Sequence, residues 1–230
     1  MRRRAQSSDA MKIEIFSDIA CPWCFIAERR LARALNAAGI QAELRFRAFQ
    51  LQPGLPAEGA PAADFFVRKF GGMDRMRGIF ERVVQVGREE GIAFDFERQK
   101  RAPNTELAHR VIYFASTRDQ AAPTVEALFR GYFEQGLNLC ELTEVVSALK
   151  RGGVALDAGE LTDAMQSGVG KQQVGRDLHD AREYGIGAVP LFIFDQRYTV
   201  EGPPPLEHFT RLIAKLRAED TPQLRAQMPL

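Results

Sequence analysis

The fold of this chain is decided by one segment, Phe16-Ser17-Asp18-Ile19-Ala20-Cys21-Pro22-Trp23-Cys24. Polar and apolar residues alternate over 12–16 before it and over 41–49 after it, and both stretches predict strands. Between them, apolar residues recur at helical spacing up to Gly39, a residue that suits a left-handed helix end. Residues 12–49 therefore predict a βαβ unit with two cysteines at the start of its helix.

The position of Cys21 gives it a specific chemistry. Pro22 suits the first helical position, so Cys21 lies at the helix N-terminus and Cys24 lies one turn further on the same face. Free N–H groups and the helix dipole stabilise a thiolate at Cys21, which lowers its pKa and makes it a nucleophile. Cys24 is then the resolving thiol of a redox-active pair.

Two plainer interpretations of the pair remain open. A Cys-x-x-Cys pair can be half of a zinc site, but zinc prefers four ligands, and Cys140 would have to meet a histidine by chance. The two cysteines can also be buried structural residues. Their position between a strand and a helix of a βαβ unit favours redox chemistry, and we expect no metal.

The rest of the chain predicts a helical insertion and a return to the sheet. Prolines and glycines over 53–61 predict a loop, and three apolar stripes between 73 and 133 predict buried helix faces. Asp157 and Glu160 resemble a capping box. A helix over 171–184, a hairpin of 191–194 and 197–200 turning at 195–196, and a helix over 206–216 complete an α/β chain.

Four segments together resemble the FrnE-like branch of the DsbA family, over about 11–216. They are 16–24, Lys69-Phe70-Gly71-Gly72, Pro103-Asn104-Thr105 with Ala108-His109, and Gly185-Ile186-Gly187-Ala188-Val189-Pro190. The resemblance implies a thioredoxin-like fold with an inserted all-helical subdomain. The thioredoxin-like domain would comprise 11–52 and 170–218, the helical insertion 53–169, a disordered leader 1–10 and a flexible tail 219–230.

The resemblance also implies roles for individual residues. Cys21, Cys24 and Pro190 would be catalytic, with a cis Val189–Pro190 bond beside the cysteines, and Pro22, Trp23, Asn104 and Val189 would contact substrate. Because proline has no backbone N–H, the edge at Val189 is open to an extended substrate backbone. Exported DsbA enzymes have a histidine inside the pair, where this chain has Pro22-Trp23, so their strongly oxidising potential is not implied.

Two further residues have two interpretations each, and two more have a structural interpretation. Asp18 either assists proton transfer from Cys24 or caps the helix start, and Asn104 either faces the dithiol or caps its own helix. We expect His109 to be packed or capping, and Cys140 to be an inert thiol.

Composition limits the partners. The formal net charge of +1 provides no general basic field, and no apolar run approaches the ~20 residues of a membrane span, so we expect neither nucleic acid nor membrane as a partner. Only three cysteines occur, and residues 1–10 have no apolar signal region, which favours the cytoplasm.

These observations predict a protein disulfide oxidoreductase that acts on protein thiols or disulfides, without a bound cofactor and with glutathione as a candidate co-substrate. The alternative is a glutathione-dependent isomerase or transferase like 2-hydroxychromene-2-carboxylate isomerase or the kappa-class transferases, which use a single serine or cysteine. A redox-sensing module with little turnover is a third hypothesis. The retained pair of cysteines favours disulfide exchange.

Overall fold

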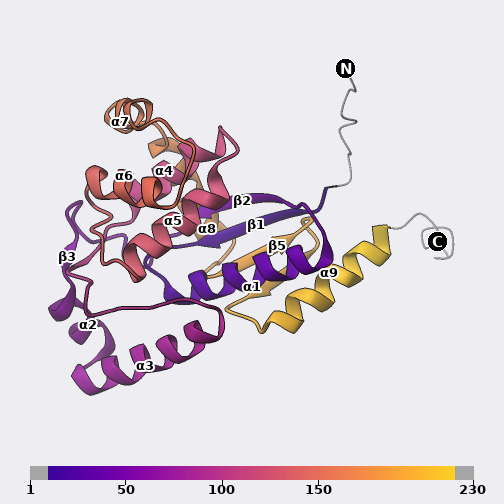
Figure 1. The fold of residues 1–230 in the computed structure, drawn as a ribbon, viewed down its shortest axis with the longest axis horizontal. Coiled ribbons are helices and arrows are strands. Elements are labelled where there is room, and N and C mark those ends of the chain that lie inside the picture. The colour runs from indigo at the N-terminus through magenta and orange to yellow at the C-terminus, as the bar shows by residue number, and fades with distance from the viewer. Residues whose placement is uncertain (1–9, 221–230) are drawn as a thin grey trace.

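The fold is that of a computed structural model, which describes residues 10–220 of the chain (Figure 1). Most of the predicted leader and tail lies outside the described residues. Glu219 and Asp220, which we assigned to the tail, belong to the last helix.

A sheet of four strands forms the centre of the thioredoxin-like part, in the order β2-β1-β5-β6. Its strands are β1 (Lys12–Ser17), β2 (Glu43–Ala48), β5 (Leu191–Phe194) and β6 (Tyr198–Glu201). β1 is parallel to β2 and antiparallel to β5, so the first and last parts of the chain meet at the middle of the sheet. Asp195 and Gln196, with φ of 48° and 55°, form the predicted hairpin turn between β5 and β6.

Helices cover both faces of the sheet and form the insertion. They are α1 (Pro22–Ala38), α2 (Ala62–Phe70), α3 (Met73–Glu89), α4 (Glu106–Ser116), α5 (Ala121–Phe133), α6 (Leu142–Arg151), α7 (Ala158–Gln166), α8 (Lys171–Glu183) and α9 (Leu206–Asp220). In Figure 1, α1 and α9 lie side by side along the sheet, whereas α2 to α7 gather beside one end of it. α8 packs against β2 and α4.

Two buried apolar clusters meet at α1. Its C-terminal half, including Leu31 and Leu35, packs with Ile13 and Ile15 of β1 and with Phe209 of α9. Its first turns belong to the cluster of the helical insertion, whose buried residues include Cys21, Cys24, Phe25, Phe129 and Phe133. The Phe25 ring stacks on Phe129 with ring centroids 4.9 Å apart. The cysteine pair therefore lies where the core of the insertion joins the sheet domain.

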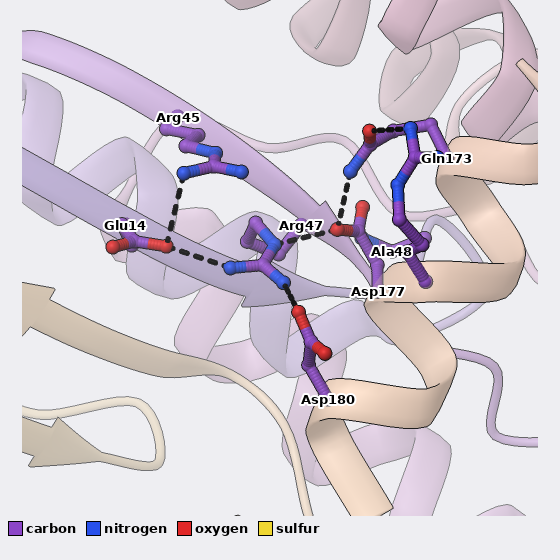
Figure 2. A network of polar contacts seen from close by, with 8 residues as sticks. Glu14, Arg45, Arg47, Ala48, Gln173, Asp177 and Asp180 are labelled. Carbon is purple, nitrogen blue, oxygen red and sulfur yellow. Dashed lines mark hydrogen bonds and ion pairs between the residues drawn. The ribbon is translucent and has the colours of Figure 1, made fainter.

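A buried ion-pair network fastens α8 to the sheet (Figure 2). Arg47 of β2 contacts three carboxylates: its Nε lies 2.6 Å from Asp177, its Nη1 2.8 Å from Glu14 and its Nη2 2.5 Å from Asp180. The other oxygen of Asp177 accepts a hydrogen bond from the backbone N–H of Ala48 at 3.0 Å. Because α8 leads directly into residues 184–190, the network also positions that loop.

The structure contains elements that we did not predict. The expected loop 53–61 ends in a short strand, β3 (Ala60–Pro61), which pairs with β4 (Arg101–Ala102). Helices α2 and α6 were not identified individually from the sequence. The α/β class, the βαβ unit and the hairpin are confirmed. The proposed division at residues 52 and 170 stays a prediction.

Candidate functional site

Cys21 is the N-cap residue of α1, with extended backbone angles of φ −100° and ψ 111°, and Pro22 follows in the first turn. The Cys21 N–H donates to the Asp18 carbonyl at 2.9 Å, which turns the chain from β1 into the helix. Cys21 is 5% exposed and Cys24 is fully buried, and no disulfide joins them. The predicted placement of the pair at a helix N-terminus is confirmed.

The surroundings of the two thiols shift their pKa values in opposite directions. A hydrogen bond from the Cys24 side chain lowers the pKa of Cys21 below its ordinary value, and the backbone N–H groups of Cys24 and Trp23 act in the same direction against burial. Burial raises the pKa of Cys24 well above its ordinary value, and the hydrogen bond to Cys21 adds to this. The geometry thus favours the thiolate at Cys21 over the thiolate at Cys24.

The loop after α8 brings Val189 and Pro190 to the dithiol. The Val189–Pro190 bond is cis, as expected, and the Val189 carbonyl oxygen lies 3.8 Å from Cys21 Sγ. Pro190 is buried directly before β5, and its carbonyl accepts a hydrogen bond from Gly202 N–H at 2.9 Å. The predicted proximity of this loop to Cys21 is confirmed, and the role of the two residues in catalysis or binding stays a prediction.

Asp18 is buried beside the pair, and both of its carboxylate oxygens accept backbone hydrogen bonds. Oδ2 accepts from Leu51 N–H at 2.7 Å and Oδ1 from Ala20 N–H at 3.2 Å. The buried ring of His109 lies with Nε2 3.5 Å from Oδ1 of Asp18 and 2.9 Å from the Phe49 carbonyl. Asp18 therefore fixes the loop after β2 against the start of α1. These backbone hydrogen bonds resemble the predicted cap more than the predicted role in proton transfer.

The other predicted contact residues lie in two places. Pro22 and Trp23 are half-buried next to Cys21. The amide of Asn104 instead holds the loop after β2: its nitrogen donates to the Leu55 carbonyl at 2.7 Å, and its oxygen accepts from Gln50 and from Glu106 N–H. Among the hydrogen bonds of residues 10–220, none joins Asn104 to Cys21 or Cys24, whereas its backbone carbonyl accepts one from the Cys140 thiol at 3.9 Å.

Two ionisable residues near the dithiol received no role from the sequence. Glu28 lies one turn after Cys24 on α1, and its Oε1 accepts a hydrogen bond from the Ser17 hydroxyl at 2.6 Å. Lys69 of α2 lies close enough for the charges of Cys21 and Asp18 to act on it, although burial lowers its pKa. The spacing of four residues from Cys24 could have identified Glu28 from the sequence. Lys69 belongs to the segment 69–72, one of the four that resemble the family.

A large groove lies apart from the dithiol. It has a volume of about 1350 Å³ between α2, α3 and residues 91–100, and Phe66, Phe80 and Phe96 line it, whereas neither cysteine does. In the described part of the chain, no cluster of three or more His, Cys, Asp or Glu side chains could hold a metal ion. No described helix is both long and apolar enough to cross a membrane.

Comparisons with known proteins agree with this geometry. The family model described as DSBA-like thioredoxin domain matches residues 12–214. A probable DsbA oxidoreductase of Streptomyces coelicolor has a similar structure, with a TM-score of 0.81 and 27% identity over 96% of this chain and 93% of that one. An uncharacterized protein of Bacillus subtilis, YwbO, is 24% identical over 79% of this chain and 85% of its own length.

More distant solved structures share the fold. A cytosolic disulfide reductase, DsbM, of Pseudomonas aeruginosa, solved with GSH, has a TM-score of 0.66 and 16% identity over 90% of this chain and 99% of its own. A 2-hydroxychromene-2-carboxylate isomerase has a TM-score of 0.67 and 15% identity over 91% of this chain and 97% of its own. The predicted thioredoxin-like fold with a helical insertion is thereby confirmed as the fold class.

Proposed function

Because the chain belongs to the DSBA-like thioredoxin domain family, we propose that it is a protein thiol-disulfide oxidoreductase that works through Cys21 and Cys24. The observation that carries the proposal is the position of the two thiols, with Cys21 as the N-cap residue of α1 and Cys24 fully buried in its first turn. In agreement with this placement, the pKa of Cys21 is lowered and that of Cys24 is raised. A pair with one acidified thiol at a helix N-terminus and one buried, protonated thiol suits attack followed by resolution.

The reaction has two exchange steps. The Cys21 thiolate attacks a substrate disulfide, forming a mixed disulfide and releasing one substrate sulfur as a thiolate. Cys24 then loses its proton and attacks Cys21 Sγ, which releases the second substrate sulfur and leaves the Cys21–Cys24 disulfide. The reverse sequence oxidises a substrate dithiol, and the direction depends on the reduction potential of the pair.

The surroundings of Cys21 favour an extended peptide as the substrate. The Val189 carbonyl lies 3.8 Å from Cys21 Sγ, so a backbone strand that presents its disulfide to Cys21 passes along this loop. Main-chain hydrogen bonds of this kind accept many sequences, and the half-buried Pro22 and Trp23 offer apolar contact beside them. In our proposal, protein thiols and disulfides are the substrates, and Pro22, Trp23 and Val189 contact them.

Three narrower assignments accompany the proposal. The four segments quoted from the sequence support the FrnE-like branch of the family. The small number of cysteines supports a cytoplasmic location. Glutathione acts as a reductant or product of the exchange and not as a tightly held cofactor.

Disulfide exchange by single variants tests the proposal. The wild type, Cys21→Ser, Cys24→Ser and Cys140→Ser are assayed for reduction of a disulfide-containing peptide with glutathione as electron donor. We expect Cys21→Ser to lose turnover, Cys24→Ser to accumulate a mixed disulfide visible by mass spectrometry, and Cys140→Ser to match the wild type. Equal residual turnover of Cys21→Ser and Cys24→Ser would contradict the two assigned roles.

The alternative is a glutathione-dependent isomerase or transferase, since a 2-hydroxychromene-2-carboxylate isomerase has the same fold. Calorimetry with glutathione and the Cys21→Ser, Cys24→Ser double variant separates the two functions. Tight binding, together with isomerase activity of that variant on an aromatic substrate, would support the alternative. Weak binding and loss of all exchange support the oxidoreductase.

A further inference from the structure

We propose that Glu28 is the proton acceptor for the buried resolving thiol of Cys24, an inference that rests on the proposed disulfide exchange. Cys24 is fully buried, so its proton has no direct path to water when the thiol attacks the mixed disulfide. A general base within the protein must take that proton, and Asp18 and Glu28 are the carboxylates whose charges act on the two thiols.

The hydrogen bonds of Asp18 leave it poorly suited to this task. Each of its two oxygens accepts a backbone N–H, from Leu51 and from Ala20. A proton taken up by Asp18 would weaken one of these bonds and loosen the loop after β2 from the start of α1. Asp18 is therefore a positioning residue.

Glu28 has the geometry of an acceptor. It follows Cys24 by four residues on α1, which places the two side chains on one face, and helical side chains lean toward the N-terminus, here toward Cys24. Ser17, buried at the end of β1, donates its hydroxyl to Oε1 of Glu28 and leaves Oε2 for a second partner. The charge of Glu28 acts on Cys24, and that of Cys21 acts on Glu28.

The acidity of Glu28 suits proton transfer near neutral pH. Burial raises its pKa to about 8, the Ser17 hydrogen bond opposes this, and the charges of Glu126 on α5 and of Cys21 add to it. Glu126 is itself paired with Arg29 at 2.5 Å and with Arg130 at 2.6 Å. In the mixed disulfide Cys21 carries no charge, so one of the causes that raise the pKa of Glu28 disappears when the base is needed.

The step balances in both directions. During reduction of a substrate, the Cys24 thiol passes its proton to the Glu28 carboxylate while Cys24 Sγ bonds to Cys21 Sγ and the substrate thiolate departs. During oxidation of a substrate, the protonated Glu28 returns the proton to Cys24 as the Cys21–Cys24 bond breaks. No oxidant or reductant beyond the disulfide and dithiol is required.

A two-phase reaction isolates this step. The reduced protein, with Cys140→Ser in every variant, is mixed with excess 5,5′-dithiobis(2-nitrobenzoate) in a stopped-flow instrument. Attack by Cys21 releases one coloured thiolate in a phase that depends on reagent concentration. Attack by Cys24 on Cys21 Sγ of the mixed disulfide releases a second coloured thiolate, and the rate of this phase is independent of reagent concentration. The two rates are measured over the pH range from about 6 to 10.

We expect Glu28→Gln to slow the second phase by about 100-fold above about pH 8, where the wild-type Glu28 is ionised, and to leave the first phase within about twofold of the wild type. The wild-type second phase should rise as Glu28 ionises, and this rise should be absent in Glu28→Gln. Ser17→Ala should move the rise to higher pH. Glu89→Gln, which removes an exposed carboxylate from α3, should change neither phase.

The outcomes separate this proposal from the one on which it rests. A second phase with the same rate and pH profile in the wild type and Glu28→Gln would overturn the role of Glu28 while leaving the exchange reaction intact. An unmoved pH profile in Ser17→Ala would also overturn it, and this variant keeps every titrating group. Absence of the first phase in the wild type would instead refute the reactive Cys21.

Discussion

Replacing Arg47 by methionine should destabilise the protein far more than the same change at Arg45. Both arginines belong to β2, and both pair with Glu14. The Arg47 side chain is 6% exposed and contacts three carboxylates, whereas the Arg45 side chain is 58% exposed and lies 3.8 Å from Glu14. The pair of variants removes the same charge from two neighbouring positions of one strand.

The expected magnitudes follow from burial. Without Arg47, the carboxylate of Asp177, whose side chain is 5% exposed, stays buried without its cation. Breaking a buried pair in this way costs about 3–5 kcal/mol, while an exposed pair such as that of Arg45 contributes about 1 kcal/mol or less. For a chain of this length, the larger loss corresponds to a melting temperature lower by roughly 6–20 °C.

Urea unfolding of the reduced proteins measures both free energies. Circular dichroism reports the helices, and the fluorescence of Trp23, the one tryptophan of the chain, reports the environment of the dithiol. Equal losses of stability in Arg47→Met and Arg45→Met would refute the reasoning, because the buried network would then stabilise the fold no more than a surface pair.

Two further predictions concern stability. The pKa of Glu28 is about 8 in the folded protein against an ordinary 4.5, so the stabilisation from its protonated form is complete below pH 4.5 and is lost as the pH rises through 8. The shift of 8 − 4.5 = 3.5 sets an upper limit of about 5 kcal/mol on this loss. In urea unfolding, Glu28→Gln should therefore gain stability relative to the wild type between about pH 5 and 9, and a pH-independent difference would contradict the raised pKa of Glu28. Gly136→Ala should destabilise the protein by roughly 2 kcal/mol or more, because φ is +71° and a Cβ would lie 2.5 Å from the Arg98 carbonyl oxygen. Gly39→Ala, with a φ of +64° and open space around it, should cost about 1 kcal/mol of stability. A thermal melt in which both variants lose the same stability would show that the contact with Arg98 adds no cost at position 136.

Sequence reasoning succeeded where the determining signals are local. Strand alternation, Pro22 after Cys21 and the Asp195-Gln196 turn each act over a few residues, and all were confirmed. The cap at Asp157 is confirmed by the hydrogen bond from Glu160 N–H to its side chain at 2.8 Å. The short helices α2 and α6 have no side-chain cap, and helices of this length depend on tertiary packing for their stability.

The surroundings of the dithiol depend on contacts between distant parts of the chain. Ser17 and Glu28 are eleven positions apart, and nothing in their spacing predicts that the end of β1 donates a hydrogen bond to a glutamate of α1. The anchoring of Asp18 by Leu51 likewise depends on the path of the chain after β2. Resemblance to a family placed Val189 and Pro190 beside Cys21, whereas composition and periodicity alone did not.

The two ends of α1 belong to different apolar clusters, and this has a consequence for folding cooperativity. Phe25 packs into the core of the insertion, while Leu31 packs against the sheet, and a single uninterrupted helix connects them. Unfolding of either the insertion or the sheet domain removes packing from the same helix, so we expect the two parts to melt together as one cooperative unit. A change in the packing of the insertion against Phe25 therefore acts on the same first turns of α1 that hold Cys21 and Cys24.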